Sequence, residues 1–213
     1  MTMKTSAAYL ALLFAQTLAL SHHRHIGSRR ELIQNSVVVA LGGLGLPDHA
    51  AMANDVVGGE VRFGQEDLMF KKSHGTTDQA VQSDLLFGVS NKLADRICSF
   101  NRIFAEPAGY FQTTGFLEVM RSTQEPVTFY DSVSGKPLFK APINRSVDEF
   151  IAESKFHGWP SFRDEEVIWS NVRVLRSSGE TVSVDGTHLG HNLPDWHGNR
   201  YCINLVSIAG RKS

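Results

Sequence analysis

The sequence predicts a mainly β domain of the α+β class that follows a helical N-terminal lead. Beyond residue 125, short runs of β-branched and aromatic residues alternate with turn-forming residues, which is typical of a β-rich domain. Before that point, apolar residues recur every four positions, which is the spacing of an amphipathic helix. The formal net charge of -1 and the two cysteines fit neither a nucleic-acid-binding surface nor a disulfide-rich scaffold.

Residues 1–53 are predicted to be a bipartite targeting segment. Residues 1–20 place one lysine before a short apolar stretch, as in a secretory signal peptide. Residues 28–53 contain Arg29-Arg30, then an apolar run, then Ala51-Met52-Ala53, which resembles a twin-arginine signal with its cleavage site. Two such signals in tandem resemble the targeting of proteins to the thylakoid lumen of plastids with extra membranes. The alternative is one export signal or signal anchor with a polar tail; cleavage after Ala53 would leave no membrane anchor.

Residues 54–124 are expected to form a helical N-terminal extension. Its first part, residues 54–77, is rich in glycine and charge, and we expect it to be loosely ordered. An amphipathic helix is predicted over residues 78–100, capped by Thr77 or Asp78. Cys98 near its end is expected to be a buried packing thiol.

Residues 125–213 are expected to form the β-rich body. Strands are predicted over residues 127–130, 167–175, 181–184 and 201–208, with a hairpin turn at residues 177–180. A short helix is predicted over residues 146–155, because Ser146 and Glu149 have the spacing of a capping box.

Candidate chemistry gathers in the last sixty residues or so. Arg200, Cys202 and Asn204 would share one face of a strand, where a guanidinium beside a thiol favours the nucleophilic thiolate. His188 and His191 are candidate proton donors; no carboxylate at a motif spacing accompanies them, so a metal site is the weaker interpretation. The alternative is a buried cysteine in a terminal strand, two surface histidines and a core tryptophan, and spacing alone does not decide between the two.

Three motifs, in order, carry a resemblance to a known family. They are Gly158-Trp159-Pro160-Ser161-Phe162, the stretch Gly186–Asp195, and Arg200-Tyr201-Cys202-Ile203-Asn204. Together they resemble the methionine-R-sulfoxide reductases of the B type (MsrB), over roughly Thr128 to Ile208. The resemblance implies two small antiparallel sheets with flanking helices, and a catalytic domain over residues 125–213.

The resemblance also implies a reaction and roles for residues. The Cys202 thiolate would attack the sulfoxide sulfur, while His188 and His191 would protonate the departing oxygen through a water molecule. Arg200 and Asn204 would complete the catalytic set. Trp159, Phe162 and Asp195 would bind substrate, with Asp195 orienting a histidine. The substrate would be an oxidised methionine of a protein, and a thioredoxin-like thiol would reduce the resulting sulfenic acid.

The chain departs from that family at three kinds of position. Where many members carry four zinc-binding cysteines, this chain has Asp131, Ser134, Val182 and Asp185, so no structural zinc and no other cofactor is expected. His157 stands at the family's resolving cysteine, which leaves Cys98 or an external thiol for that step. Leu205 and Gly210 alter the expected pocket wall. These departures keep a second hypothesis open: a catalytically inactive interaction or assembly subunit of a lumenal complex.

Overall fold

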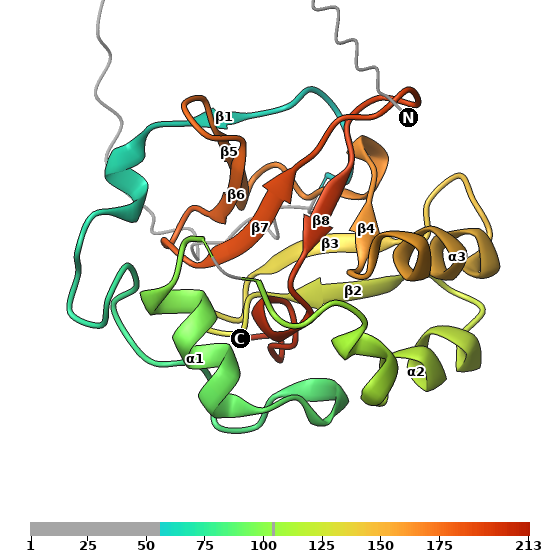
Figure 1. Ribbon diagram of the computed structural model, residues 1–213, viewed down its shortest axis with the longest axis horizontal. Helices are drawn as coiled ribbons and strands as arrows, with labels where there is room; N and C mark the ends of the chain where they lie inside the picture. Colours follow the sequence, from blue (N-terminus) through green and yellow to red (C-terminus); the bar gives the residue numbers. More distant parts are fainter. Residues whose placement is uncertain (1–55, 104) are drawn as a thin grey trace, which may run out of the picture. The chain divides into compact units, whose positions relative to one another are not determined.

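The structure is a computed structural model that describes residues 56–103 and 105–213, which build a mixed α/β fold around two sheets (Figure 1). The predicted targeting segment, residues 1–53, lies outside the described residues. The strands are β1 (Phe63–Gly64), β2 (Val127–Tyr130), β3 (Pro137–Ala141), β4 (Ser161–Phe162), β5 (Val172–Leu175), β6 (Glu180–Ser183), β7 (His188–Asn192) and β8 (Tyr201–Ile203).

The larger sheet has six strands in the order β1-β5-β6-β7-β8-β4, and β2 pairs with β3 in the smaller one. The pairings are antiparallel except that of β1 with β5, which is parallel. The expectation of two mainly antiparallel sheets is therefore confirmed at this coarse level, with one parallel edge. Strand β2 and the β5–β6 hairpin occur where they were predicted, although β5 fills only the end of the strand predicted over residues 167–175. The predicted strand over residues 201–208 ends at Ile203 and is followed by a 3-10 helix, η5 (Leu205–Ser207).

The longer helices are α1 (Asn91–Phe100), α2 (Phe116–Ser122) and α3 (Val147–His157). Helix α3 and its Ser146–Glu149 capping box confirm the prediction for that segment. The predicted helix over residues 78–100 is wrong in its first half, because α1 begins only after its N-cap Ser90, whose side chain accepts from the Leu93 amide. Phe87 and Gly88 have positive φ angles of 61° and 69°, which interrupts any helix there.

The segment from residue 56 to residue 77 is ordered, so the expectation of loose order from its composition is wrong. Strand β1 pairs with β5, the Gly58 amide donates to the Val167 carbonyl, and the Thr76 amide donates to the Ser99 carbonyl. Met69 from the short 3-10 helix η1 (Glu66–Met69) packs with Leu175 and Val182 in a small apolar cluster. Tertiary pairing thus supplies the order that the glycine-rich sequence lacks.

The extension and the β-rich body share one hydrophobic core. Ile97 of α1, Phe111 and Phe116 from the extension are buried with Phe129, Phe139 and other apolar side chains of the body. Isolated bridges join the smaller sheet to segments that flank the larger one, from Tyr130 to Gly210 and from Phe139 to Val167. Helix α1 contacts η5 and β7, α2 contacts α3, and α3 lies next to β4 (Figure 1). In residues 56–103 and 105–213, no helix combines the length and apolar character that crossing a bilayer requires.

Candidate active site

A pocket of about 360 Å³ opens where strands β7 and β8 face α3 and the extension. It gathers Cys202, Arg200 and Asn204 with His188, His191 and Trp159, six of the residues singled out in the sequence. The remaining lining residues are Ile103, Ala105, His157, Gly190 and Leu193. Ile103 and Ala105 belong to the extension, which therefore supplies part of the pocket wall.

Strand register brings the histidines to the cysteine. Cys202 of β8 lies opposite His191 of β7, and directly opposed residues of an antiparallel pair point to the same face. Gly190 allows the two strands to approach at this point, because a side chain there would overlap the carbonyl group of Cys202. On its other side, β8 pairs with β4 so that Cys202 also faces Ser161. Cys202 is thus held between two strands with its thiol in the pocket.

The Cys202 thiol lies at the end of a row of charged side chains. Arg200 donates a hydrogen bond from Nη1 to the Cys202 sulfur. The Arg200 Nε lies 3.3 Å from a carboxylate oxygen of Asp195, an ion pair without hydrogen-bond geometry. Arg163 donates to both Asp195 oxygens, at 3.1 and 2.9 Å, and these bonds hold the pKa of Asp195 far below its usual range.

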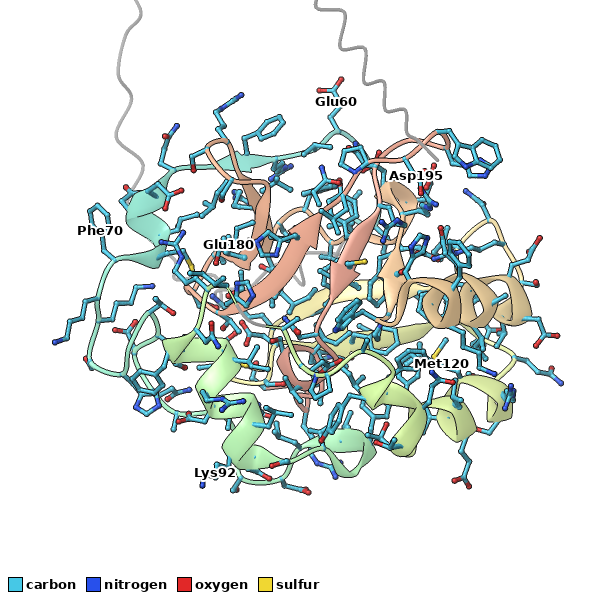
Figure 2. All side chains as sticks on the ribbon, in the orientation of Figure 1. Glu60, Phe70, Lys92, Met120, Glu180 and Asp195 are labelled. Atoms are coloured by element: carbon cyan, nitrogen blue, oxygen red, sulfur yellow. The ribbon has the colours of Figure 1, made fainter. Side chains whose placement is uncertain are left out.

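The predicted role of Asp195 therefore needs correction. Its carboxylate contacts arginines rather than orienting a histidine. Figure 2 labels Asp195 on the β8 side of the pocket strands and Glu180 on the β6 side. Asp195 is well placed to fix Arg200, and through it the charge beside the Cys202 sulfur.

A different carboxylate orients the buried histidine. His188 Nδ1 is hydrogen-bonded to the Oε1 oxygen of Glu180, on β6, at 2.7 Å. Both side chains are almost fully buried: Glu180 is 3% exposed and His188 is 2% exposed. The other oxygen of Glu180 accepts two hydrogen bonds from Arg102, at 2.9 and 2.6 Å. Burial would raise the pKa of Glu180, but these hydrogen bonds outweigh it and the pKa is lowered. Glu180 is therefore an ionised acceptor.

His191 differs from His188 in its surroundings. Its ring lies 5.6 Å from the ring of His188, centroid to centroid. Burial, followed by the proximity of His188, lowers the pKa of His191, so its neutral imidazole is favoured at pH 7. Burial and the nearby Arg200 likewise lower the pKa of His157. A neutral imidazole can both donate and accept hydrogen bonds, as a group that holds a water molecule must.

Glu106 of the extension fixes the apolar wall and the polar end of the pocket. Its backbone carbonyl accepts from the Trp159 indole at 3.0 Å, and its amide donates to Asn204 Oδ1 at 2.9 Å. Its carboxylate accepts from the amides of Leu205 and Val206, just after β8. Burial outweighs these backbone donors and raises the pKa of Glu106 to about 7. Asn204 is thus held in place on both sides, since its amide nitrogen also donates to the Leu189 carbonyl.

Two residues of the predicted site lie in the core instead. Phe162 is completely buried and stacks on Phe139 with ring centroids 4.4 Å apart, so its role is packing rather than substrate contact. Cys98 is a free, buried thiol whose sulfur lies 3.6 Å from Ser207 Oγ. Burial raises the pKa of the Cys98 thiol well above its usual range, which keeps it protonated. In this conformation Cys98 neither shares the pocket of Cys202 nor provides the thiolate that a resolving step needs.

The four positions compared with zinc-binding cysteines have other contacts. The buried Asp131 carboxylate accepts from the Thr187 hydroxyl at 2.9 Å and from the Val133 amide at 2.8 Å. Ser134 Oγ accepts from the Lys136 amide at 3.4 Å. Val182 is part of a small apolar cluster, and Asp185 forms an ion pair with Lys136. Among the described residues, Glu153, His157 and Asp195 have potential ligand atoms within 4.8 Å of one another. Both carboxylates in that group already pair with arginines, so it gives no argument for a metal ion.

Sequence reasoning missed Glu180, Arg102 and Glu106. Glu180 was assigned to a turn, although it lies eight positions before His188 in a β hairpin. Arg102 and Glu106 belong to the extension, where no sequence pattern connects them with partners that lie 78 to 100 positions later.

Around one pocket lie a cysteine beside an arginine, two histidines and an indole wall, and one of the histidines, His188, is hydrogen-bonded to a buried glutamate behind it. In comparisons with known proteins, no family model, curated protein or solved structure matches this chain.

Proposed function

We propose that this protein is a thiol-dependent oxidoreductase that reduces methionine-R-sulfoxide, with Cys202 as the nucleophile. One observation carries the proposal: Cys202 shares a single pocket with Arg200, His188, His191 and Trp159. A nucleophilic thiol, a cation beside it, proton carriers and an apolar wall are the parts that sulfoxide reduction needs. The MsrB-like fold and the R configuration of the substrate rest on the motif resemblance.

In the first step, the Cys202 thiolate attacks the sulfoxide sulfur while one proton is delivered to the sulfoxide oxygen. That attack forms a bond between the two sulfur atoms; the oxygen then passes to Cys202 as both this S–S bond and the S–O bond of the substrate break. The products are a sulfenic acid on Cys202 and a methionine thioether, so the cysteine sulfur is oxidised by two electrons as the substrate sulfur is reduced. His188 and His191 are placed to hold the water that delivers the proton, since both line the pocket that contains the thiol.

The second step regenerates the enzyme with an external dithiol of the thioredoxin kind. One thiol attacks the Cys202 sulfenic acid and releases water, forming a mixed disulfide; the second thiol then displaces Cys202 as a thiol. The burial of Cys98 and its raised thiol pKa argue for this external route, because an internal resolving cysteine must reach the sulfenic acid as a thiolate.

The mouth of the pocket favours a methionine within a polypeptide. Ile103, 81% exposed, and Leu193, 47% exposed, place apolar side chains at the lining, and Trp159 supplies a flat wall for the terminal methyl group. Apolar residues that flank an oxidised methionine could contact this rim, whereas a free amino acid would bring its charged groups to it.

Turnover of a defined peptide R-sulfoxide by the full chain tests the proposal, with dithiothreitol or thioredoxin as reductant. We expect turnover with either, no turnover with Cys202→Ser, and little turnover of the S-sulfoxide. Equal activity on both epimers would contradict the R assignment.

A second candidate function is that of a non-catalytic assembly subunit, and exposed aromatic side chains favour it. Trp196 and Phe156 are 87% and 85% exposed, and such side chains are enriched where proteins bind one another. We propose the thylakoid lumen as the compartment for either function, on the order of targeting signals in residues 1–53. Co-purification with a membrane complex at fixed stoichiometry, without sulfoxide turnover, would favour the subunit.

A further inference from the structure

A row of alternating charges runs from the surface of the extension to the buried histidine of the pocket. Ser177 and Arg102 bind Glu66, and the Arg102 Nη2 lies 2.8 Å from a Glu66 oxygen. The same guanidinium binds Glu180, which binds His188 Nδ1 at 2.7 Å. Each oxygen of Glu180 thus has its own partner, one from the extension and one from the pocket.

The ionised state of Glu180 decides which ring nitrogen of His188 carries hydrogen. An ionised carboxylate only accepts hydrogen bonds, so Nδ1 must be the donor in that contact. Nε2 is then the nitrogen left for substrate or water. Glu180 is almost completely buried, and a buried carboxylate stays ionised only while a cation or donors compensate for lost solvent. The cation here is Arg102.

We infer that Arg102, a residue of the N-terminal extension, is a positioning residue for His188: it keeps Glu180 ionised and so fixes the ring and tautomer of a histidine that lines the pocket of Cys202. This inference rests on the proposed function for its consequence in turnover, but its structural content stands apart from it. The N-terminal extension would then contribute to the site, although it precedes Thr128, where the resemblance to the family begins.

The charges around His188 come from several elements. Glu180 faces it from β6, and Arg102 and Glu66 lie behind Glu180. His191 on the same strand is a second titratable neighbour, and β8 contributes Cys202 with Arg200 to the same pocket. Of these groups, Arg102 and Glu66 come from the extension.

The test compares Arg102→Met with Arg121→Met in the full chain. Arg121 is an exposed arginine of α2 in the same extension and serves as the matched control. With Arg102→Met we expect kcat for the peptide sulfoxide to fall by about tenfold, with KM little changed. This fall in kcat is smaller than the roughly hundredfold or greater loss expected when a general acid itself is removed. Glu180 should then take up a proton at higher pH, so activity should be lost at a higher pH on the acid side. Arg102→Lys keeps a charge but loses the fork and should recover part of the rate.

Ring nitrogen NMR separates this inference from the proposed function. The native protein should show His188 hydrogen-bearing at Nδ1, and both Arg102→Met and Glu180→Gln should weaken that preference, whereas Arg121→Met should not. If the native protein reduces no sulfoxide, the proposed function fails while the NMR comparison still decides the role of Arg102. If Arg102→Met misfolds, Arg102→Gln, which keeps a polar side chain at this part-exposed position but removes the charge, should shift the same signals in the same direction. Unchanged His188 signals in the variant that folds, Arg102→Met or in its place Arg102→Gln, would overturn the inference.

Discussion

The carboxyl of Glu106 predicts a specific dependence of stability on pH. Burial raises its pKa from 4.5 to about 7, so the folded protein binds a proton there that the unfolded chain releases at lower pH. A raised carboxyl pKa gives stability that is complete below the unfolded pKa and is lost as pH rises through the folded one. The difference corresponds to about 3 kcal/mol of unfolding free energy, lost between about pH 4.5 and pH 7.

The substitution that isolates this effect is Glu106→Gln, which cannot ionise. Its amide replaces one of the two carboxylate oxygens that accept from Leu205 and Val206, so it loses one buried acceptor, at about 1–3 kcal/mol at every pH. The difference in unfolding free energy between the native protein and Glu106→Gln should therefore change with pH only through the ionisation of Glu106, because the lost acceptor costs the same at every pH. Other titrating groups cancel as well, because both proteins contain them.

Urea unfolding followed by tryptophan fluorescence at pH 4.5, 5.5, 6.5 and 7.5 measures that difference. We expect Glu106→Gln to gain on the native protein by about 3 kcal/mol from the lowest to the highest pH. A difference that stays constant with pH would refute the reasoning, because it would mean that Glu106 has the same proton affinity in the folded and unfolded states.

Three further predictions concern the pocket and its surroundings. Gly190→Ala should push β8 away from β7 and lower turnover by about a hundredfold. Gly115→Ala serves as the control and should leave turnover unchanged, because a side chain there would lie at ordinary contact distance from its neighbours. Equal activity of the two variants would contradict the close approach of the strands at Gly190. Asp195→Asn should lower turnover several-fold by freeing Arg200. Its loss of stability, measured by thermal unfolding, should be full above about pH 3.8, the usual pKa of the group, and should shrink gradually as pH falls from there toward the much lower pKa of the folded state. Cys98→Ala should leave dithiothreitol- and thioredoxin-dependent turnover unchanged while costing about 1 kcal/mol of stability, and a selective loss of thioredoxin-dependent turnover would show that Cys98 is the resolving thiol.

Local signals in the sequence were enough for the elements that local interactions determine. The capping box at Ser146 and Glu149 placed α3, and the turn at residues 177–180 placed the β5–β6 hairpin. The four-residue spacing before α1 wrongly predicted a helix. The apolar residues at 81, 85 and 89 belong to an irregular segment that packs on the core, and amides of this segment donate to carbonyls of the distant body. Periodicity cannot reveal such pairing, since the partners lie far along the chain.

The candidate site divides in the same way. The residues on β7 and β8 could be grouped from the sequence, because strand alternation and the motifs bring them to one face. The residues behind them could not: Arg102 and Glu106 come from a segment without a recognisable motif, and the contact of Asp195 with arginines depends on where β4 ends. Phe162 shares a motif with Trp159, yet the two side chains lie in different environments, one in the core and the other at the pocket.

A single turnover without reductant tests the central claim most directly. The full chain, reduced and freed of thiol, is mixed with excess peptide R-sulfoxide, and both the methionine peptide and the modification state of each cysteine are measured by mass spectrometry. We predict one methionine peptide per protein molecule and one oxygen added at Cys202, trapped as a sulfenic acid, with Cys98 unmodified. Release of methionine that persists in Cys202→Ser, or no release by the native protein, would contradict the account.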